Sequence, residues 1–430
     1  DKFKVWPTQL DRPQFADVVG AGSKDELLRR YPERRRPRAR KADPRPRMVE
    51  AYLFFYRQLT EFFLGSAGEP PLAAEVPLSM RVEECFQALK NALQVVEIDL
   101  EQGDDAQVIF ETLNARGEPL LPADLLRNYI FLRAARGNEP QEALYKEYWA
   151  RFDDQFWRVA VKQGRLLRPR SDLFLQHFLS SRLAVDVPIT HLFEEYKFWI
   201  DRDKPFATVK DELSCLARQG EDFRRIIAPA KDDVLFGLAT FIEAFDVRTT
   251  YPLVLAMLDQ GYDDRQWRLV SSILESYLLR RAVCGLTTKN YNRIFLTLAR
   301  TLRRQGMTPE ELAKHLGEQS GESGEWPKDE RFSEAWRTQH AYHLLNNPKV
   351  VHILSRLKDT YATSKMESIQ FEGALTVEHI LPQGWVENWP LQDGAKGLTV
   401  LDMFMADEAD ARMIASRARN QVLQTLGNLT

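Results

Sequence analysis

The sequence predicts a mainly α-helical protein with small α+β parts, on three observations. Apolar residues recur at helical spacing over most of residues 138–360, with a wide apolar stripe across 267–278. The run 94–100 instead alternates and is rich in β-branched residues, which is typical of a strand. A second strand-like run, 375–379, opens onto a loop at Pro382.

Length and composition limit the class of protein further. The 430 residues predict roughly two to three domains. With 59 basic and 62 acidic residues the net charge is −3, so any contact with nucleic acid must come from a local basic patch. Three widely spaced cysteines indicate reduced thiols, and the absence of a signal peptide or a long apolar run predicts a cytoplasmic protein. We also expect both ends to have been cut from a longer chain.

A basic run between residues 34 and 47 is the first candidate site. Eight basic residues stand against one acid, Asp43, and the interspersed prolines disfavour a helix. Two interpretations remain open: a loop that contacts phosphates, or a solvated linker. The candidate DNA contacts are Arg34, Arg35, Arg36, Arg38, Arg40 and Lys41.

Helices are predicted at 48–64 and 82–93, ahead of a second candidate site in the block 104–128. Within that block we expect a short helix at 106–113, a capping turn at 114–117 and a further helix that starts near Pro122. The turn would present Asn114 and Arg116 at its tip. Plain helix capping explains these residues as well as a binding role does.

The long middle region offers no catalytic motif of its own. Arg280 and Arg281 could face DNA, but basic residues near a helix end also complement the helix dipole, and we favour that interpretation. A single helix is predicted over 341–357. His340 and His343 share a helix face without an acidic partner, so we do not assign them as ligands.

The third candidate site is the pair Glu378 and His379. Successive residues of a strand point to opposite faces, so the carboxylate can hold a divalent metal ion while the imidazole acts as a general base on water. That arrangement suits a one-metal ββα nuclease hairpin. The alternative is that Glu378 and His379 are a structural pair at the surface or at the edge of a core, with no catalytic role. A helix is expected at 407–418, and the basic residues Arg412, Arg417 and Arg419 in or next to it either contact phosphates or form a solvated face.

The run Glu378-His379-Ile380-Leu381-Pro382, together with Gly427-Asn428-Leu429-Thr430, resembles the HNH nuclease domain of the GmrSD-type restriction proteins. The resemblance implies His379 as the base, Glu378 as a metal ligand and Asn428 as the residue that orients the base. In that family a following helix supplies another metal ligand, and it would lie beyond Thr430.

The block Phe110–Asn128, which contains Asn114, Arg116 and Gly117, resembles the ParB-like, nucleotide-handling N-terminal domain of the same family. The resemblance implies that Asn114 and Arg116 contact nucleotide or phosphate. The family's hydrolysis motif, Asp-Gly-Gln-Gln-Arg, would lie before Asp1. Leu121 departs from the Ser or Thr that the family favours as a helix cap.

The resemblance implies three parts: the C-terminal part of a ParB-like domain (1–137), a helical connector (138–360) and a truncated HNH domain (361–430). The implied function is a phage-defence endonuclease that senses modified DNA, as relatives that recognise phosphorothioate DNA do. It would use Mg²⁺ or Mn²⁺, bind GTP or ATP, allow homo-oligomers and need no membrane. The alternative is a non-catalytic, nucleotide-gated DNA-binding or scaffold protein with a vestigial hairpin.

Overall fold

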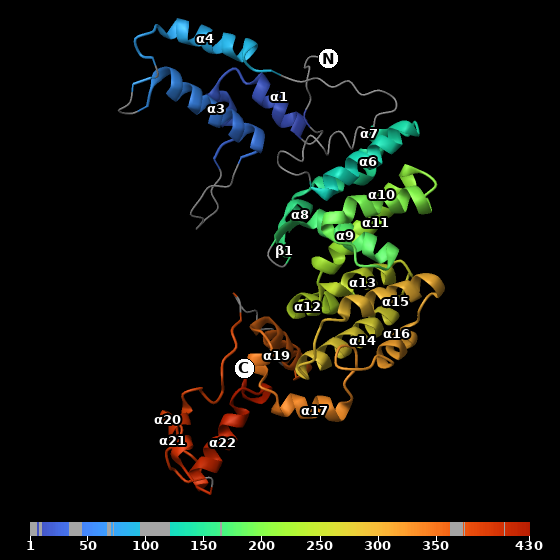
Figure 1. Cartoon of the computed structure of the whole chain (residues 1–430), viewed down its shortest axis with the longest axis vertical. Coiled ribbons are helices and arrows are strands. Elements are labelled where there is room, and N and C mark those ends of the chain that lie inside the picture. Colours follow the sequence, from blue (N-terminus) through green and yellow to red (C-terminus); the bar gives the residue numbers. More distant parts are fainter. Residues whose placement is uncertain are drawn as a thin grey trace. The chain divides into compact units, whose positions relative to one another are not determined.

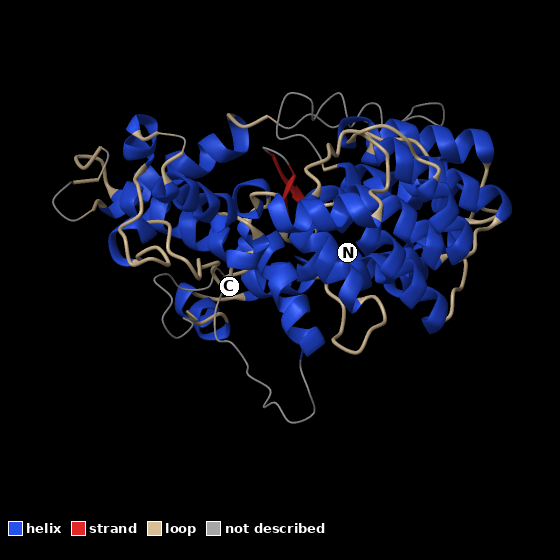
Figure 2. Cartoon of the chain, turned by 90° about the horizontal axis from the view of Figure 1, so that it is seen from below, coloured by secondary structure: helices blue, strands red, loops and turns tan. Residues whose placement is uncertain are grey.

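The computed structural model describes Pro7, residues 11–33, 45–66, 70–71, 73–94, 121–163 and 166–361, Gly373, and residues 375–407 and 409–430. Contacts divide the chain into two compact units, Asp1–Ala106 and Gln107–Thr430. Nearly all regular structure is helical (Figures 1 and 2), which confirms the predicted class. Among the described residues, no helix is long and apolar enough to cross a membrane.

The first unit is a small group of helices around α3. Ser23 begins α2 by accepting a hydrogen bond from the Glu26 amide at 3.2 Å, and α3 ends at Gly65, whose positive φ of 85° suits glycine. Helix α3 contacts the other three helices. The bounds are α1 Arg12–Gly20, α2 Lys24–Arg30, α3 Arg47–Leu64 and α4 Leu78–Asn91.

The second unit is built around α13 (Tyr251–Leu258), which is apolar on all sides and therefore buried. Helices α9, α11 and α15 pack around it. The helices that precede α13 are α6 Pro122–Arg136, α7 Gln141–Leu144, α8 Gln155–Arg158, α9 Arg170–Leu183, α10 Leu192–Asp203, α11 Val209–Ile227 and α12 Phe236–Phe245. Single turns of other helix types are η2 Tyr145–Trp149, η3 Ala150–Asp153, η4 Ile189–His191 and η5 Arg248–Thr250.

The rest of the second unit is also mainly helical. Several helices of this unit begin with a capping box, in which the N-cap residue and the residue three positions later exchange hydrogen bonds. Thr208, Asp263, Thr308 and Thr399 each exchange hydrogen bonds with the residue three positions later, starting α11, α14, α16 and α21. The elements after α13 are α14 Asp264–Val283, α15 Tyr291–Gln305, α16 Pro309–Gly317, α17 Asp329–Thr338, α18 Ala341–Leu344, α19 Asn347–Tyr361, α20 Trp385–Asn388, α21 Val400–Met405, α22 Ala411–Leu423 and η6 Leu426–Asn428.

Several local predictions need correction. The middle region is almost entirely helical, as predicted, but it also contains two short strands that the sequence did not indicate: β1 (Ala160–Gln163) and β2 (Leu166–Pro169) form an antiparallel pair in which Ala160 faces Pro169. The single helix predicted over 341–357 is two helices, since Pro348 fits the first turn of α19 and cannot continue α18. The C-terminal helix begins at Ala411 rather than 407 and runs to Leu423.

Other predictions fall on residues that the structure does not describe. The expected strand at 94–100 lies there except for Gln94, as do the expected helix at 106–113 and the turn with Asn114 and Arg116. The basic residues Arg34, Arg35, Arg36, Arg38, Arg40 and Lys41 also lie outside the described residues.

Candidate active site

The structure places the two C-terminal motifs side by side, although almost fifty residues separate them. The backbones of Glu378 and Thr430 exchange two hydrogen bonds of 2.9 Å, and the Ile380 amide donates to the Asn428 carbonyl at 2.8 Å. His379 therefore lies opposite Leu429 in an isolated antiparallel bridge. The pairing is shorter than two full strands, because Leu426–Asn428 turns into the 3-10 helix η6.

Asn428 is buried and holds the loop that follows His379. Its side-chain oxygen accepts from the Leu381 amide at 2.8 Å, and its Nδ2 donates to the carbonyls of Leu381 at 3.1 Å and Leu423 at 2.7 Å. These bonds fully engage the amide with backbone groups. Asn428 therefore fixes the backbone around His379 and makes none of these bonds to the imidazole itself.

Two residues that the sequence analysis did not identify contact the His379 ring. Nε2 lies 3.0 Å from Oε1 of Gln424, and the Tyr342 ring meets the imidazole edge-to-face at 4.5 Å between centroids. The Tyr342 amide also donates to the Gln424 carbonyl at 3.1 Å, which ties the two neighbours together. No motif marks either residue, because they come from α18 and from the turn after α22.

The contact with Gln424 selects a tautomer. A side-chain carbonyl oxygen can only accept, so this contact favours the tautomer in which Nε2 carries the hydrogen and the lone pair lies on Nδ1. Gln383 Nε2, a donor that would need the opposite tautomer, lies farther from the same ring nitrogen, at 3.5 Å, so the shorter contact with Gln424 outweighs it. A half-buried imidazole held in this way can receive a proton through Nδ1.

The Glu378 side chain is exposed, while its backbone is fixed by the pairing with Thr430. A divalent cation normally takes several oxygen or nitrogen ligands from the protein. Within the part of the chain that the structure describes, no group of three or more His, Cys, Asp or Glu side chains is placed to hold a metal ion. The described residues therefore do not make a complete metal site around Glu378.

The segment between the two motifs forms a small core around Trp385. Its ring is buried, its Nε1 donates to Asn420 Oδ1 at 3.0 Å, and it packs with Leu391 and Leu423. Arg419 lies over this ring and donates to the carbonyls of Trp389 and Pro390, both at 2.9 Å. Arg419 thus has a structural role.

The other two arginines of α22 differ in their partners. Arg412 lies 3.7 Å from Asp410, whereas the exposed Arg417 makes no ion pair with any described residue. Arg417 is therefore the better candidate of the two for contact with a phosphate backbone.

Arg281 of α14 is fully buried and donates to the carbonyls of Thr287, Glu322 and Glu325 at 2.6–3.0 Å. Arg280 pairs with Asp329 at 2.6 Å. Both arginines are engaged within the protein, in line with the structural interpretation of this pair.

Comparison with known proteins covers both ends of the chain. The family model for the GmrSD restriction endonuclease N-terminal domain matches residues 1–131, and the model for the C-terminal domain of GmrSD restriction endonucleases matches residues 326–430. No curated protein matches the chain. The first match contains Asn114, Arg116 and the basic run, and the second contains Glu378, His379 and Asn428.

Proposed function

The chain belongs to the GmrSD restriction endonuclease family, and from this premise we propose that it cuts DNA with His379 as the general base. Family membership supports a phage-defence restriction endonuclease with DNA as its partner. The observation that carries the finer proposal is the hairpin, in which two distant motifs meet and the His379 ring is held by Gln424 and Tyr342.

In the proposed reaction, Nδ1 of His379 takes a proton from water as the water oxygen attacks the scissile phosphorus. The bond from phosphorus to the leaving sugar oxygen then breaks, and that oxygen takes up a proton from a second water molecule to leave as a hydroxyl group. Gln424 keeps the lone pair on Nδ1, and Asn428 keeps the backbone of the hairpin in place. Each contributes through His379 and is therefore a positioning residue.

The cofactor part of the proposal is a divalent ion, Mg²⁺ or Mn²⁺, with Glu378 as one ligand. The support for it is family membership and the exposed carboxylate beside the base, because the described residues supply no further ligands. Glu378→Gln should lower cleavage while leaving the fold intact, since its backbone makes the hairpin bonds.

The N-terminal part completes the proposal. We assign nucleotide contact, with GTP or ATP, to Asn114 and Arg116, and phosphate contact along DNA to the basic residues between Arg34 and Lys41. The match of residues 1–131 to the family's N-terminal domain supports both assignments. Binding or hydrolysis of the nucleotide would regulate cleavage of modified DNA by the HNH-type site.

The test uses the natural full-length protein on plasmid DNA with Mg²⁺ or Mn²⁺, with and without GTP or ATP, and on modified and unmodified plasmids in parallel. Wild type and His379→Ala are compared, with His315→Ala as a matched control because His315 lies on α16, far along the chain. We expect wild type and His315→Ala to nick or linearise one plasmid, and His379→Ala to leave it intact.

Two other outcomes contradict the assignment. Equal cleavage by wild type and His379→Ala would place the activity elsewhere. If all variants bind DNA and none cuts any plasmid, the non-catalytic alternative applies: a nucleotide-gated DNA-binding or scaffold protein with a vestigial hairpin.

A further inference from the structure

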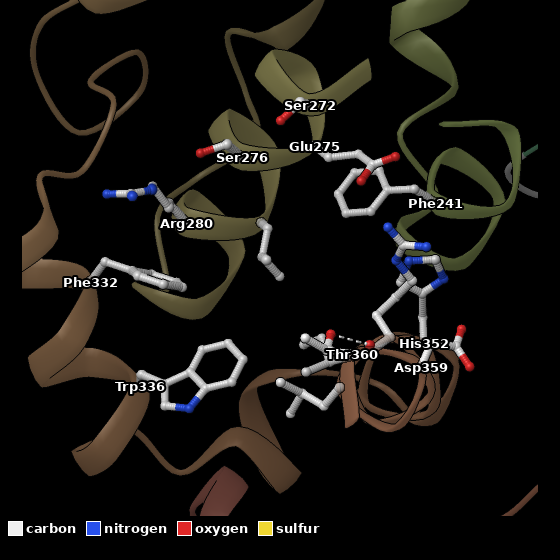
Figure 3. A pocket seen from close by; sticks show the side chains of 14 residues that line it. Phe241, Ser272, Glu275, Ser276, Arg280, Phe332, Trp336, His352, Asp359 and Thr360 are labelled. Carbon is white, nitrogen blue, oxygen red and sulfur yellow. Dashed lines mark hydrogen bonds between the residues drawn. The ribbon is translucent and has the colours of Figure 1, made fainter. Parts of the chain in front are cut away.

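A cavity of about 580 Å³ lies between α12, α14, α17 and α19 (Figure 3). None of its lining residues belongs to the hairpin that carries His379. Its volume falls within the range of small-molecule sites, and its lining combines aromatic rings with a few converging polar groups, as such sites do. It is therefore a separate candidate binding site.

The polar wall of the cavity pairs an acid with a base that do not contact each other. Glu275 of α14 and Arg356 of α19 both line the cavity and lie close enough to interact electrostatically, but neither forms an ion pair with any described residue. Burial raises the pKa of the Glu275 carboxyl, and the nearby Arg356 guanidinium opposes that rise. The wall thus offers a half-buried carboxylate beside an exposed guanidinium, and neither is occupied by an ion pair with a described residue.

His352 completes this wall as a neutral group. Its ring meets Phe241 and Phe245 edge-to-face, with centroids 5.6 Å and 5.9 Å apart. Burial lowers the pKa of the imidazole, and Arg356 lowers it further. His352 therefore adds no charge that would compete for Glu275.

The opposite wall is aromatic and held in place. Phe332 and Trp336 of α17 lie 5.4 Å apart at 59°, and the Arg280 guanidinium covers Phe332 at 5.0 Å. Arg280 is anchored by Asp329 at 2.6 Å and by the Pro327 carbonyl at 3.1 Å. This wall presents ring faces suited to a flat, apolar surface.

We propose that the cavity binds a guanine base, packed against Trp336 and Phe332 with its polar edge toward Glu275 and Arg356. Guanine carries adjacent N–H donors, which a carboxylate accepts, and the acceptors O6 and N7, which a guanidinium recognises. Adenine lacks the ring N–H and leaves the carboxylate half satisfied. A free guanine nucleotide and a guanine turned out of a DNA strand share this chemistry.

The position of α17 gives the site a link to the rest of the molecule. The same helix contacts η6, which carries Asn428 of the hairpin. A ligand held against Trp336 would therefore touch the helix on which the hairpin rests. Binding itself does not depend on cleavage, so His379→Ala should bind as wild type does.

The test is calorimetric titration of the full chain with GMP, AMP and inorganic phosphate. We expect GMP to bind at least about tenfold more tightly than AMP, with phosphate alone giving no heat. Glu275→Gln and Arg356→Met should each weaken GMP binding at least about tenfold. Lys358→Met, on the same helix but outside the cavity lining, is the matched control and should leave affinity unchanged. Thermal melting establishes that each variant is folded.

Three outcomes would overturn the proposal: no saturable GMP binding, GMP binding that both cavity variants retain, or an equal loss of GMP, AMP and phosphate binding in Arg356→Met. The second would place the nucleotide at another site, and the third would reveal an anion site only. A thymidine oligonucleotide with one central guanine distinguishes the two sources. Binding with the same sensitivity to Glu275→Gln identifies a base turned out of DNA; binding of GMP alone identifies the free nucleotide.

Discussion

The helical middle of the chain and the segment between the two C-terminal motifs differ in how deeply they are packed. In the middle, α13 is enclosed on all sides, and residues 253–257 are at most 1% exposed. Between the motifs, the core is Trp385, Leu391 and Leu423, while Phe404 and Met405 of α21 are 83% and 87% exposed. Shallow packing lowers the free energy of local opening, so we expect this segment to open before the middle does.

The hairpin that carries His379 packs with the middle helices, unlike the segment between its two motifs. Val377, Leu426 and Leu429 belong to the same core as the middle helices, whereas the intervening segment has its own small cluster. The difference teaches that the candidate base is anchored on the main core of the second unit, and it predicts that the segment after it can open without releasing the base. The predictions below test this difference.

Arg281→Leu should give the largest effect, a loss of about 3–5 kcal/mol in the free energy of unfolding, because several charge-assisted hydrogen bonds are lost together and three carbonyls are left buried. Chemical denaturation of the full chain measures it. Arg268→Leu, exposed on the same helix, should change stability by less than about 0.5 kcal/mol. Equal effects in both variants would show that α14 does not depend on its buried arginine.

His177→Phe should remove part of the acid sensitivity of the middle. His177 lies between the rings of Phe223 and Tyr251, and burial, with Arg248, lowers the pKa of its imidazole to about 4. Below pH 6.5 the imidazole of His177 is protonated in the unfolded chain but stays neutral in the folded chain. The free energy of unfolding therefore falls by about 3 kcal/mol as the pH is lowered to 4. Denaturation at pH 7 and pH 4 should show that this loss is absent in the variant. The same loss in both proteins would contradict the assignment.

Gly397→Ala tests the small core. A Cβ at this position would lie 2.4 Å from two carbons of the Trp385 ring, and such overpacking costs about 1–3 kcal/mol. Limited proteolysis should cut the segment 385–423 faster while the middle stays resistant. Gly384→Ala is the control, because its Cβ would meet no atom within 4 Å. Parallel loss of resistance in the middle would mean that the two regions open as one.

Gln424→Ala should have the smallest effect. Loss of one hydrogen bond of about 1 kcal/mol to the His379 ring predicts roughly fivefold slower cleavage and a loss of at most about 1 kcal/mol in the free energy of unfolding. The rate is measured by plasmid cleavage, with Gln421→Ala, exposed on α22, as the control. An unchanged rate in Gln424→Ala would show that Tyr342 and the backbone alone position the base.

Local patterns predicted much of the fold. The apolar stripe over 267–278 became α14, and the helix predicted from Met48 to Leu64 is α3, because amphipathic spacing in long segments dominates local preference. The sequence pattern does not predict strands β1 and β2, because a strand of four residues is too short to show a clear alternation of apolar and polar residues. The start of α19 was missed because the apolar pattern outweighed Pro348.

The candidate site was predictable only in part. The motif around Glu378 and His379 and its partner Asn428 are visible as sequence, and their resemblance to one family implied that they meet. Gln424 and Tyr342 carry no motif, so only the folded chain reveals their contact with the base. The cavity could be predicted even less from the sequence, because Glu275, Trp336 and Arg356 come from three different helices that meet only in the folded chain.

The anchoring of the hairpin has an evolutionary consequence. If recombination joined the chain after Tyr361 to a foreign partner, His379 would be separated from Tyr342, and Val377, Leu426 and Leu429 would lose the side chains they pack against. In such a hybrid protein the apolar surfaces of these three side chains would be exposed, and the His379 ring would lose its contact with Tyr342. We therefore expect the segment that carries His379 to keep its structure only when it is inherited together with α17 and α18, and not when it is exchanged on its own.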